Sequence, residues 1–358
     1  MHMGRKVIVL ILAVIVLTGL SAGYVVEGIQ AYSRYLVDNQ EHCGGQSPVH
    51  VCVQSPPAIF SAFYPSYVST NVPLINVKYS SSSPITLIIS AGILNFSQQE
   101  TVTVNATANT QTVSFIPPLL NGNVLRQLTN NMNTSLQVRV MDTHNTLYYV
   151  DDSPVLLHSR WLMEWVAANR LKIVAWVTPD DPAIAQLVKR AISHLQAQPP
   201  PAPTTMAGYD SASTTTVKDQ VDAIFDALRL DYHIRYVQAS VPYGGPDDNN
   251  VALQDIRLPF EVLQQRSGMC VELTALLASA VEHIGLHAEI VIVPGHAFLG
   301  VAVNPNDSQF EYWDAVEVNN NVAGDSANIF ADHEYKQQHI IDTILISRAR
   351  AQGIGPMI

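Results

Sequence analysis

The pattern of apolar and polar positions separates a β-rich segment from a later segment of mixed helices and strands. Between residues 53 and 156, short stretches rich in β-branched residues partly alternate in polarity, with Ser, Asn and Pro clusters between them. The predicted strands cover 72–79, 84–90, 100–106, 111–116, 136–140 and 146–150. About seven short strands in roughly 100 residues favour an immunoglobulin-like β-sandwich. The segment shows no cluster of catalytic residue types, so we expect a spacer or a binding module.

After residue 156, apolar residues recur first at helical spacing and later in β-rich runs. The predicted elements are a connecting helix over 159–170, helices that begin near Pro182 and Val217, a helix over 270–284, and strands over 288–293, 297–303 and 309–318. Residues 198–216 include a Pro-rich run and predict a flexible loop. The fold class expected for residues 157–358 is therefore α+β.

An apolar run precedes both segments. Arg5 and Lys6 are followed by 20 residues without a charge, 7–26, and a helix of that length reaches about 30 Å, the thickness of a bilayer core. Positive charge on the N-terminal flank keeps that end in the cytoplasm. We therefore expect residues 1–30 to be a transmembrane signal-anchor, with the bulk of the protein outside the cytoplasm, at the cell surface or in the periplasm. A signal peptide cleaved near residues 21–23 is the alternative.

Charge and cysteine content narrow the range of functions. The net charge is −11, and no run of Lys or Arg suggests a nucleic-acid partner. Cys43 and Cys52 lie in a linker over 31–52, and they can form a disulfide in an oxidising compartment. Cys270 is left over from a total of 3 cysteines. A leftover thiol among His and acidic residues is a candidate nucleophile, and a buried core cysteine is the alternative.

The position of Cys270 favours reactivity. Ser267 and Gly268 interrupt the chain just before the predicted helix, so Cys270 falls on the first turn of that helix. There the free backbone N–H groups and the helix dipole stabilise a thiolate, and the same N–H groups can face a developing oxyanion. A cysteine that only fills the core would more naturally lie on the apolar face in mid-helix.

His296 and Asp314 complete the candidate site. The turn signal at 304–307 predicts a β-hairpin, and a loop of three or five residues would pair His296 directly with Asp314 on one face. A loop of even length would put them on opposite faces. Glu317 is the rival carboxylate, but its position three residues further along directs it to the other face. His296 taken alone could be a structural histidine at a strand end. No spacing of His, Cys and acidic residues matches zinc, so we expect no metal and no other cofactor.

Residues from about 176 to 345 resemble bacterial transglutaminase-like domains, a branch of the papain-like cysteine fold. The matching motifs are 176–182, 254–263, 266–272, 285–286, 295–298 and 312–314. The resemblance covers just under half of the chain. It implies Cys270 as the nucleophile, His296 as base and then acid, and Asp314 as the residue that orients the imidazole. It also implies Gln264, which precedes Cys270 by six positions, as a candidate oxyanion donor.

Two departures from the family pattern bear on the reaction. Val271 stands where calcium-dependent cross-linking enzymes carry Trp, and Phe298 replaces the Trp that often follows His-Ala. These changes argue against calcium-dependent cross-linking and leave hydrolysis or acyl transfer at a peptide or protein amide as the expected reaction. The expected partners are a peptide or protein substrate and, through the N-terminal helix, a membrane. A non-catalytic transglutaminase-like binding or scaffold protein of the cell envelope is the alternative. The sequence does not indicate an oligomeric state.

Overall fold

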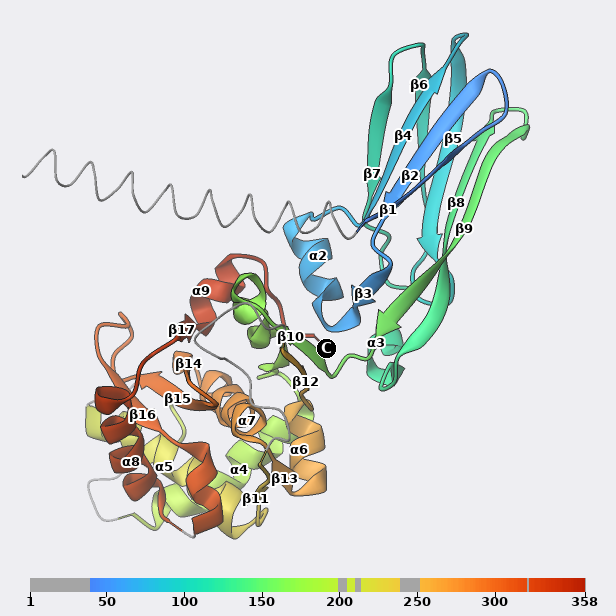
Figure 1. Cartoon of the computed structure of the whole chain (residues 1–358). Coiled ribbons are helices and arrows are strands. Elements are labelled where there is room, and N and C mark those ends of the chain that lie inside the picture. Colours follow the sequence, from blue (N-terminus) through green and yellow to red (C-terminus); the bar gives the residue numbers. More distant parts are fainter. Residues whose placement is uncertain (1–38, 199–204, 210–213, 239–251, 321, 358) are drawn as a thin grey trace, which may run out of the picture. The chain divides into compact units, whose positions relative to one another are not determined.

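The computed structural model describes residues 39–198, 205–209, 214–238, 252–320 and 322–357, which form two compact units (Figure 1). Of these residues, the first unit comprises 39–59, 73–118 and 133–156. The second unit comprises 60–72, 119–132 and the residues from 157 onward. The first unit thus ends where the sequence pattern changes, but two short segments before that point belong to the second unit.

The first unit is built on two sheets of mostly short strands. One sheet has the order β1 (Gln40–Gly44), β2 (Val49–Ser55), β4 (Ile75–Ser81) and β7 (Gln111–Phe115), with antiparallel neighbours throughout. The other has the order β3 (Ala58–Phe60), β9 (Leu147–His158), β8 (Met132–Asp142), β5 (Ile85–Ile93) and β6 (Glu100–Ala106). Polarity alternates along the inner strands, and inward positions such as Val77 and Ile89 are fully buried. Burial of one face of each sheet is the packing of a sandwich.

Part of the segment expected to be a linker contributes two strands to this unit. Val49, Val51 and Val53 are buried and alternate with polar residues, which is why β2 joins the sheet. β1 pairs with β2 so that Cys43 lies opposite Cys52, and a disulfide links the two residues. The linker expected over 31–52 is therefore corrected from residue 40 onward.

The expected fold class included a transmembrane helix, and the structure corrects this. No helix in the described part of the chain is long and apolar enough to cross a membrane. The longest helix described, α5 (Thr214–Leu230), has 17 residues and carries Lys and Asp, whereas a bilayer requires about 20 mostly apolar residues. The described chain is a mixed α+β fold with several sheets. The helix expected over 1–30 lies outside the described residues.

The second unit centres on an antiparallel sheet with the order β16 (Phe310–Trp313), β15 (His296–Ala302), β14 (Ala288–Val293) and β17 (Asp342–Leu345). Helix α7 (Cys270–His283) packs against β14 and β15, and α8 (Gly324–Gln337) packs against β16.

The other helices described in this unit are α2 (Tyr64–Thr70), α3 (Asn123–Gln127), α4 (Pro182–Gln196), α5, α6 (Pro259–Gln265) and α9 (Ile346–Ala351), with the 3-10 helices η1 (Ser61–Phe63), η2 (Ala167–Trp176) and η3 (Ala315–Asn320). Two small sheets pair β10 (Leu162–Trp165) with β12 (Ala252–Asp255) and β11 (Arg235–Tyr236) with β13 (Ser267–Gly268).

Two elements of this unit differ from the expected ones. The connecting helix expected over 159–170 is replaced by β10 and η2, because β10 pairs with the distant strand β12. The strand expected over 309–318 ends at Trp313 and continues as η3. There Oδ1 of Asp314 accepts a hydrogen bond from Val316 N at 3.0 Å, which favours a turn over a continued strand.

The expected start of α4 is confirmed, whereas the loop expected over 198–216 is described only in part and ends earlier, where α5 begins at Thr214. Helix α4 begins after Asp181, whose side chain accepts a hydrogen bond from Ala183 N at 2.8 Å. The loop expected over 198–216 is described in part, and its Gly208 exchanges hydrogen bonds with the side-chain amide of Gln220. The rest of that loop, 199–204 and 210–213, lies outside the described residues.

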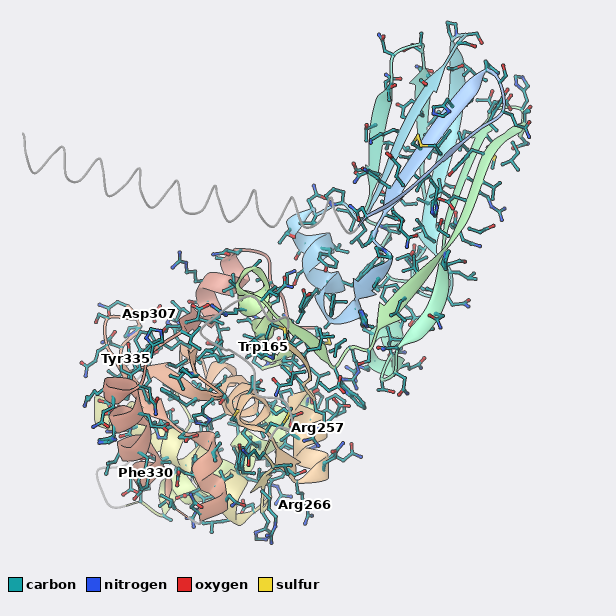
Figure 2. All side chains as sticks on the ribbon, viewed as in Figure 1. Trp165, Arg257, Arg266, Asp307, Phe330 and Tyr335 are labelled. Atoms are coloured by element: carbon teal, nitrogen blue, oxygen red, sulfur yellow. A yellow bond between two sulfur atoms is a disulfide. The ribbon has the colours of Figure 1, made fainter. Side chains whose placement is uncertain are left out.

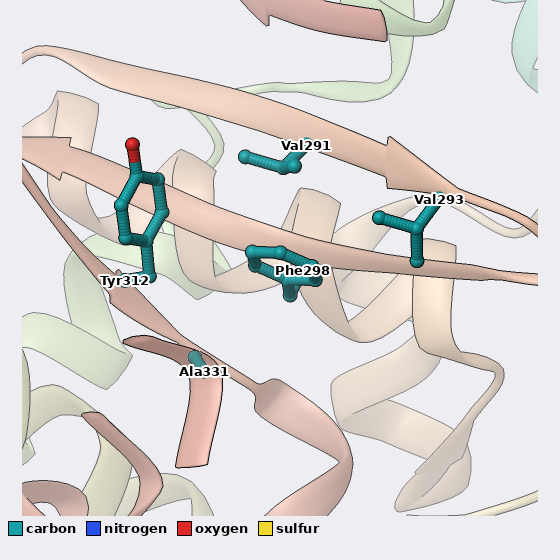
Figure 3. Packing of buried hydrophobic residues seen from close by; sticks show 5 residues of the cluster. All are labelled: Val291, Val293, Phe298, Tyr312 and Ala331. Carbon is teal, nitrogen blue, oxygen red and sulfur yellow. The ribbon is translucent and has the colours of Figure 1, made fainter. Parts of the chain in front are cut away.

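A cluster of apolar side chains joins the central sheet to α8 (Figure 3). Its members are Val291, Val293, Phe298, Tyr312 and Ala331. Tyr335, one helical turn after Ala331, stacks on Tyr312 with ring centroids 4.0 Å apart. Because residues three and four positions apart share a helix face, the inward face of α8 continues from Ala331 to Glu334 and Tyr335. This face brings Glu334 to His296, the first residue of β15.

Candidate active site

Cys270 is the first residue of α7, and its thiol is free and buried. Just before it, β13 runs parallel to β11, with Gly268 paired to Tyr236. A Cβ at Gly268 would lie 2.8 Å from Cδ2 of Leu273, so this close approach of strand and helix favours glycine. The sequence Gly-Met-Cys thus takes the chain from a strand into a helix within two residues. The thiol consequently lies where the first backbone N–H groups of α7 have no acceptor within the helix.

A buried carboxylate fixes the start of α7. The side chain of Glu272 is 1% exposed, and its Oε2 accepts a hydrogen bond from Met269 N at 2.9 Å. Arg257, labelled in Figure 2, donates to the same carboxylate from Nη2 at 2.7 Å, from Nε at 3.0 Å and from its backbone N at 2.7 Å. A negative charge in the first turn also complements the helix dipole. Cys270 therefore lies between Met269 and Glu272, and the ion pair of Glu272 with Arg257 holds both of these residues in place.

The ring of His296 lies between a carboxylate and the thiol. Its Nε2 lies 3.1 Å from Oδ2 of Asp314, whose side chain is 8% exposed. Burial alone would lower the pKa of His296, but hydrogen bonds to Asp314 and Cys270, together with their charges, raise this pKa to about 10. Because Asp314 engages Nε2, Nδ1 is the ring nitrogen that remains for the thiol.

His296 and Asp314 meet through a strand register that differs from the expected one. Leu299 pairs with Trp313 across the hairpin, so the hairpin turns one residue later than expected. In this register Asp314 comes level with Phe298, and the expected direct pair with His296 is wrong by two positions. Because the shift is even, the two side chains stay on one face and still reach each other.

Two further residues lie at the site without belonging to any motif recognised in the sequence. Tyr236 pairs with Gly268, two residues before Cys270, and burial raises the pKa of Tyr236, with the charges of Cys270 and Asp314 raising it further. Oε2 of Glu334 lies 3.8 Å from Nε2 of His296. Burial raises the pKa of Glu334, and the charge of Asp314 adds to this increase.

The sequence carries little signal for these two residues. Tyr236 reaches the site because β11 pairs with β13, and each of these strands has only two residues. For Glu334 a weak signal exists, because Ala327, Ala331 and Glu334 recur at helical spacing. That spacing predicts one helix face, but it does not show which strand the face covers.

Two residues that the sequence suggested for the site lie apart from Cys270, His296 and Asp314. Gln264, the expected oxyanion donor, is exposed on α6, and no hydrogen bond between described residues joins it to Cys270 or His296. Glu317, the rival carboxylate, lies in η3 and accepts a hydrogen bond from Asn320 Nδ2 at 3.0 Å. The backbone N–H groups at the start of α7 are therefore the donors better placed to face an oxyanion.

Comparison of the sequence with protein-family models and with curated proteins gives no match. The site combines a thiol at a helix start, an imidazole with a raised pKa and a carboxylate that fixes the ring. These groups suit nucleophilic attack of sulfur on an acyl carbon.

Proposed function

We propose that the protein is a cysteine-dependent enzyme that hydrolyses peptide or protein amides or transfers their acyl groups. The observation that carries the proposal is the His296 ring, whose Nε2 lies 3.1 Å from Oδ2 of Asp314 and whose pKa is raised by both Asp314 and Cys270. A nucleophile, a base and a group that orients the base are the three parts that such a reaction needs. The resemblance of residues 176–345 to transglutaminase-like domains supports the same proposal.

The proposed reaction has two stages. First, Nδ1 of His296 takes the proton of the Cys270 thiol, the sulfur attacks the amide carbon, and the first-turn N–H groups of α7 stabilise the oxyanion. His296 then gives its proton to the departing amine nitrogen, and a thioester remains on Cys270. In the second stage water or another amine, deprotonated by His296, attacks the thioester and releases the sulfur. Asp314 holds the ring and stabilises its positive charge.

The Cys43–Cys52 disulfide supports action in an oxidising compartment outside the cytoplasm. With these two residues joined, Cys270 has no cysteine partner within the chain and remains a thiol. The proposed substrates are therefore peptides or proteins exposed to that compartment.

Alkylation tests the nucleophile directly. Iodoacetamide at neutral pH should label Cys270 in the native protein faster than in the urea-unfolded protein, because His296 takes the thiol proton only in the folded state. His296→Ala should remove this advantage, whereas Glu317→Gln, the matched control, should retain it. A native rate at or below the unfolded rate would count against the proposal.

Turnover tests the reaction type. Fluorescently labelled casein reports hydrolysis, and a fluorescent primary amine added to the same mixture reports acyl transfer. Cys270→Ala should abolish both signals, and Asp314→Asn should reduce turnover roughly 100-fold or more, because the ring loses its orienting charge. Activity that persists in Cys270→Ala would contradict the proposal.

A further inference from the structure

We propose that His296, Asp314 and Glu334 bind a divalent first-row transition-metal ion, with Zn²⁺ as the best match, and that the bound ion switches off the Cys270 thiol. The switching rests on the function proposed above, whereas the binding rests on geometry alone. The sequence leads to the opposite expectation, because the three ligands lie in β15, the segment after β16, and α8, with no spacing typical of zinc.

The ligand atoms are spaced as a tetrahedral ion requires. Nε2 of His296 lies 3.1 Å from Oδ2 of Asp314 and 3.8 Å from Oε2 of Glu334, and all three atoms lie within 4.8 Å of one another. Zinc bonds to nitrogen and oxygen are about 2.0–2.2 Å long, which puts neighbouring tetrahedral ligands about 3.4 Å apart. One ion can therefore touch all three atoms with only small side-chain movements.

The second carboxylate forms an ion pair with the protonated His296 ring but makes no side-chain hydrogen bond in the described part of the chain. Oε2 of Glu334 is buried and has no hydrogen-bond partner among the described residues. Its 3.8 Å separation from Nε2 of His296 is too long for a hydrogen bond. A buried acceptor without a donor costs free energy, so such an atom calls for an explanation, and a bound cation provides one.

The surrounding structure holds the ligands before any ion arrives. Oδ1 of Asp314 is fixed by Val316 N, which leaves Oδ2 directed at the ring. The position of Glu334 follows from the packing of its neighbours Ala331 and Tyr335 against the central sheet. Ligands oriented by other contacts lose little conformational freedom on binding a metal.

A metal on Nε2 changes what the ring can do. A neutral imidazole has one nitrogen lone pair that accepts a bond, and the metal would use the pair on Nε2. Nδ1 then keeps its hydrogen and cannot take the proton of the Cys270 thiol. Binding would also draw Asp314 from the ring to the ion. The ion therefore removes the general base and its orienting group in a single step.

The ligand set also indicates which metals should bind. Imidazole nitrogen favours Zn²⁺, Co²⁺ and related ions, whereas Ca²⁺ prefers six to eight oxygen ligands and Mg²⁺ an octahedral, mostly hydrated shell. One nitrogen and two carboxylate groups leave a fourth tetrahedral position for water, as in zinc sites that are not fully closed by protein ligands. We therefore expect zinc and cobalt to act and calcium and magnesium to have no effect.

Binding is measured first, without reference to activity. Full-length protein treated with a chelator and then freed of it is titrated with Zn²⁺ by calorimetry, and Co²⁺ absorption reports the geometry. We expect one ion per chain with tetrahedral cobalt bands. Glu334→Gln should weaken binding at least about tenfold, since even the loss of a residue that only hydrogen-bonds a metal ligand costs that much. Asp332→Asn, a matched change on the same helix, should leave the affinity unchanged, and so should Cys270→Ala. Equal affinity in Glu334→Gln, or loss of binding in Cys270→Ala, would overturn the site.

Switching is measured next with iodoacetamide. Zn²⁺ should slow labelling of Cys270 in the native protein, and Glu334→Gln should need at least about tenfold more zinc for the same slowing, each variant being compared with its own zinc-free rate. Zinc that binds through Glu334 without slowing the labelling would overturn the switch. If the zinc-free rate shows no advantage over unfolded protein, the proposed function fails while the calorimetric result on the site stands.

Discussion

Asp142 in the first unit and Glu272 in the second are both buried carboxylates, but their partners differ. Asp142 accepts hydrogen bonds from the backbone N–H groups of His144 and Thr146, each at 2.8 Å, within a single turn. Glu272 instead binds Arg257, which precedes it by 15 residues and lies before a different helix. The charge of Asp142 thus shapes one local turn, whereas the charge of Glu272 fixes one element against another.

The same arrangement occurs at the start of α6. Glu261 accepts a hydrogen bond from Leu258 N at 2.9 Å and two more from the buried guanidinium of Arg160, at 2.9 and 2.7 Å. Two successive helices therefore begin at a buried glutamate that a distant arginine holds. The first unit is stabilised by the burial of alternating apolar residues. In the second unit these two ion pairs also fix where α6 and α7 begin. Cys270 lies at one of the two helix starts.

The largest expected effect comes from removing one of these charges. Glu272→Ala leaves Arg257 without its partner and Met269 N without its acceptor, and breaking a buried pair in this way costs about 3–5 kcal/mol. We expect urea unfolding of the second unit at lower concentration and a loss of Cys270 labelling. Hydrogen exchange should show little change in peptides of the first unit.

Glu317→Ala is the control for this change, because that carboxylate bonds only an exposed amide in the described structure. It should shift stability by less than about 0.5 kcal/mol. A Glu272→Ala protein as stable as this control would show that the ion pair does not set the stability of the second unit.

The next effect should appear in the first unit alone. Replacement of both Cys43 and Cys52 by Ser removes a link that closes a short loop, and the expected loss is about 2–3 kcal/mol. Faster hydrogen exchange should be confined to β1, β2 and their neighbours, and the rate of Cys270 labelling should not change. Slower labelling would mean that the two units are energetically coupled.

A smaller effect of opposite sign is expected at Asp222 in α5. Trp313 Nε1 donates to its Oδ1 at 2.7 Å, and burial raises the pKa of Asp222 to about 7. The folded protein thus keeps a proton that the unfolded chain loses near pH 3.8, so this group makes the second unit less stable as pH rises from about 4 to about 7.

Asp222→Asn removes this pH dependence and keeps the acceptor for Trp313. At pH 7 the variant should be more stable than the native protein, and near pH 4 the two should be equally stable. Urea unfolding at several pH values measures the difference. A variant that is less stable at pH 7 would contradict this account.

The smallest effect should appear at Asp142, with the reverse sign. The backbone N–H of Thr146 holds the pKa of Asp142 below its usual value, so the stabilisation from this carboxylate exists above about pH 4 and disappears as pH falls further. Asp142→Asn should flatten the acid end of the unfolding profile, with a small loss of stability at neutral pH and none at low pH, where the native carboxyl is already protonated. An unchanged acid profile would show that the turn does not depend on the charge.

The signals that predicted this fold and site were local ones. Asp181 before Pro182 predicts the start of α4, and the Ser-Gly break before Cys270 predicts a thiol on a helix first turn, where the structure has it. These features depend on backbone groups within a few residues, so sequence order alone contains them. The turn signal at 304–307 likewise predicts the hairpin, but it leaves open whether the loop has the odd length that puts His296 and Asp314 on one face.

What the sequence did not reveal depends on contacts between distant elements. The register of β15 and β16 differs by two positions from the expected one, and β16 ends at Trp313, where Asp314 turns the chain. Tyr236 and Glu334 reach the site through strand pairing and helix packing, and neither stands in a recognisable motif. The partner of Glu272 is also invisible locally, because its charge could have been solvated as well as buried.

The course of the chain between the two units limits how this protein can change over generations. Segments 60–72 and 119–132 belong to the second unit although the first unit surrounds them in sequence. Leu128 O accepts the backbone N–H of Arg160 at 2.8 Å, so an arginine that anchors α6 depends on one of these segments. A recombination event at residue 157 would transfer a second unit that lacks both. We therefore expect recombination to exchange the two units together and not one at a time.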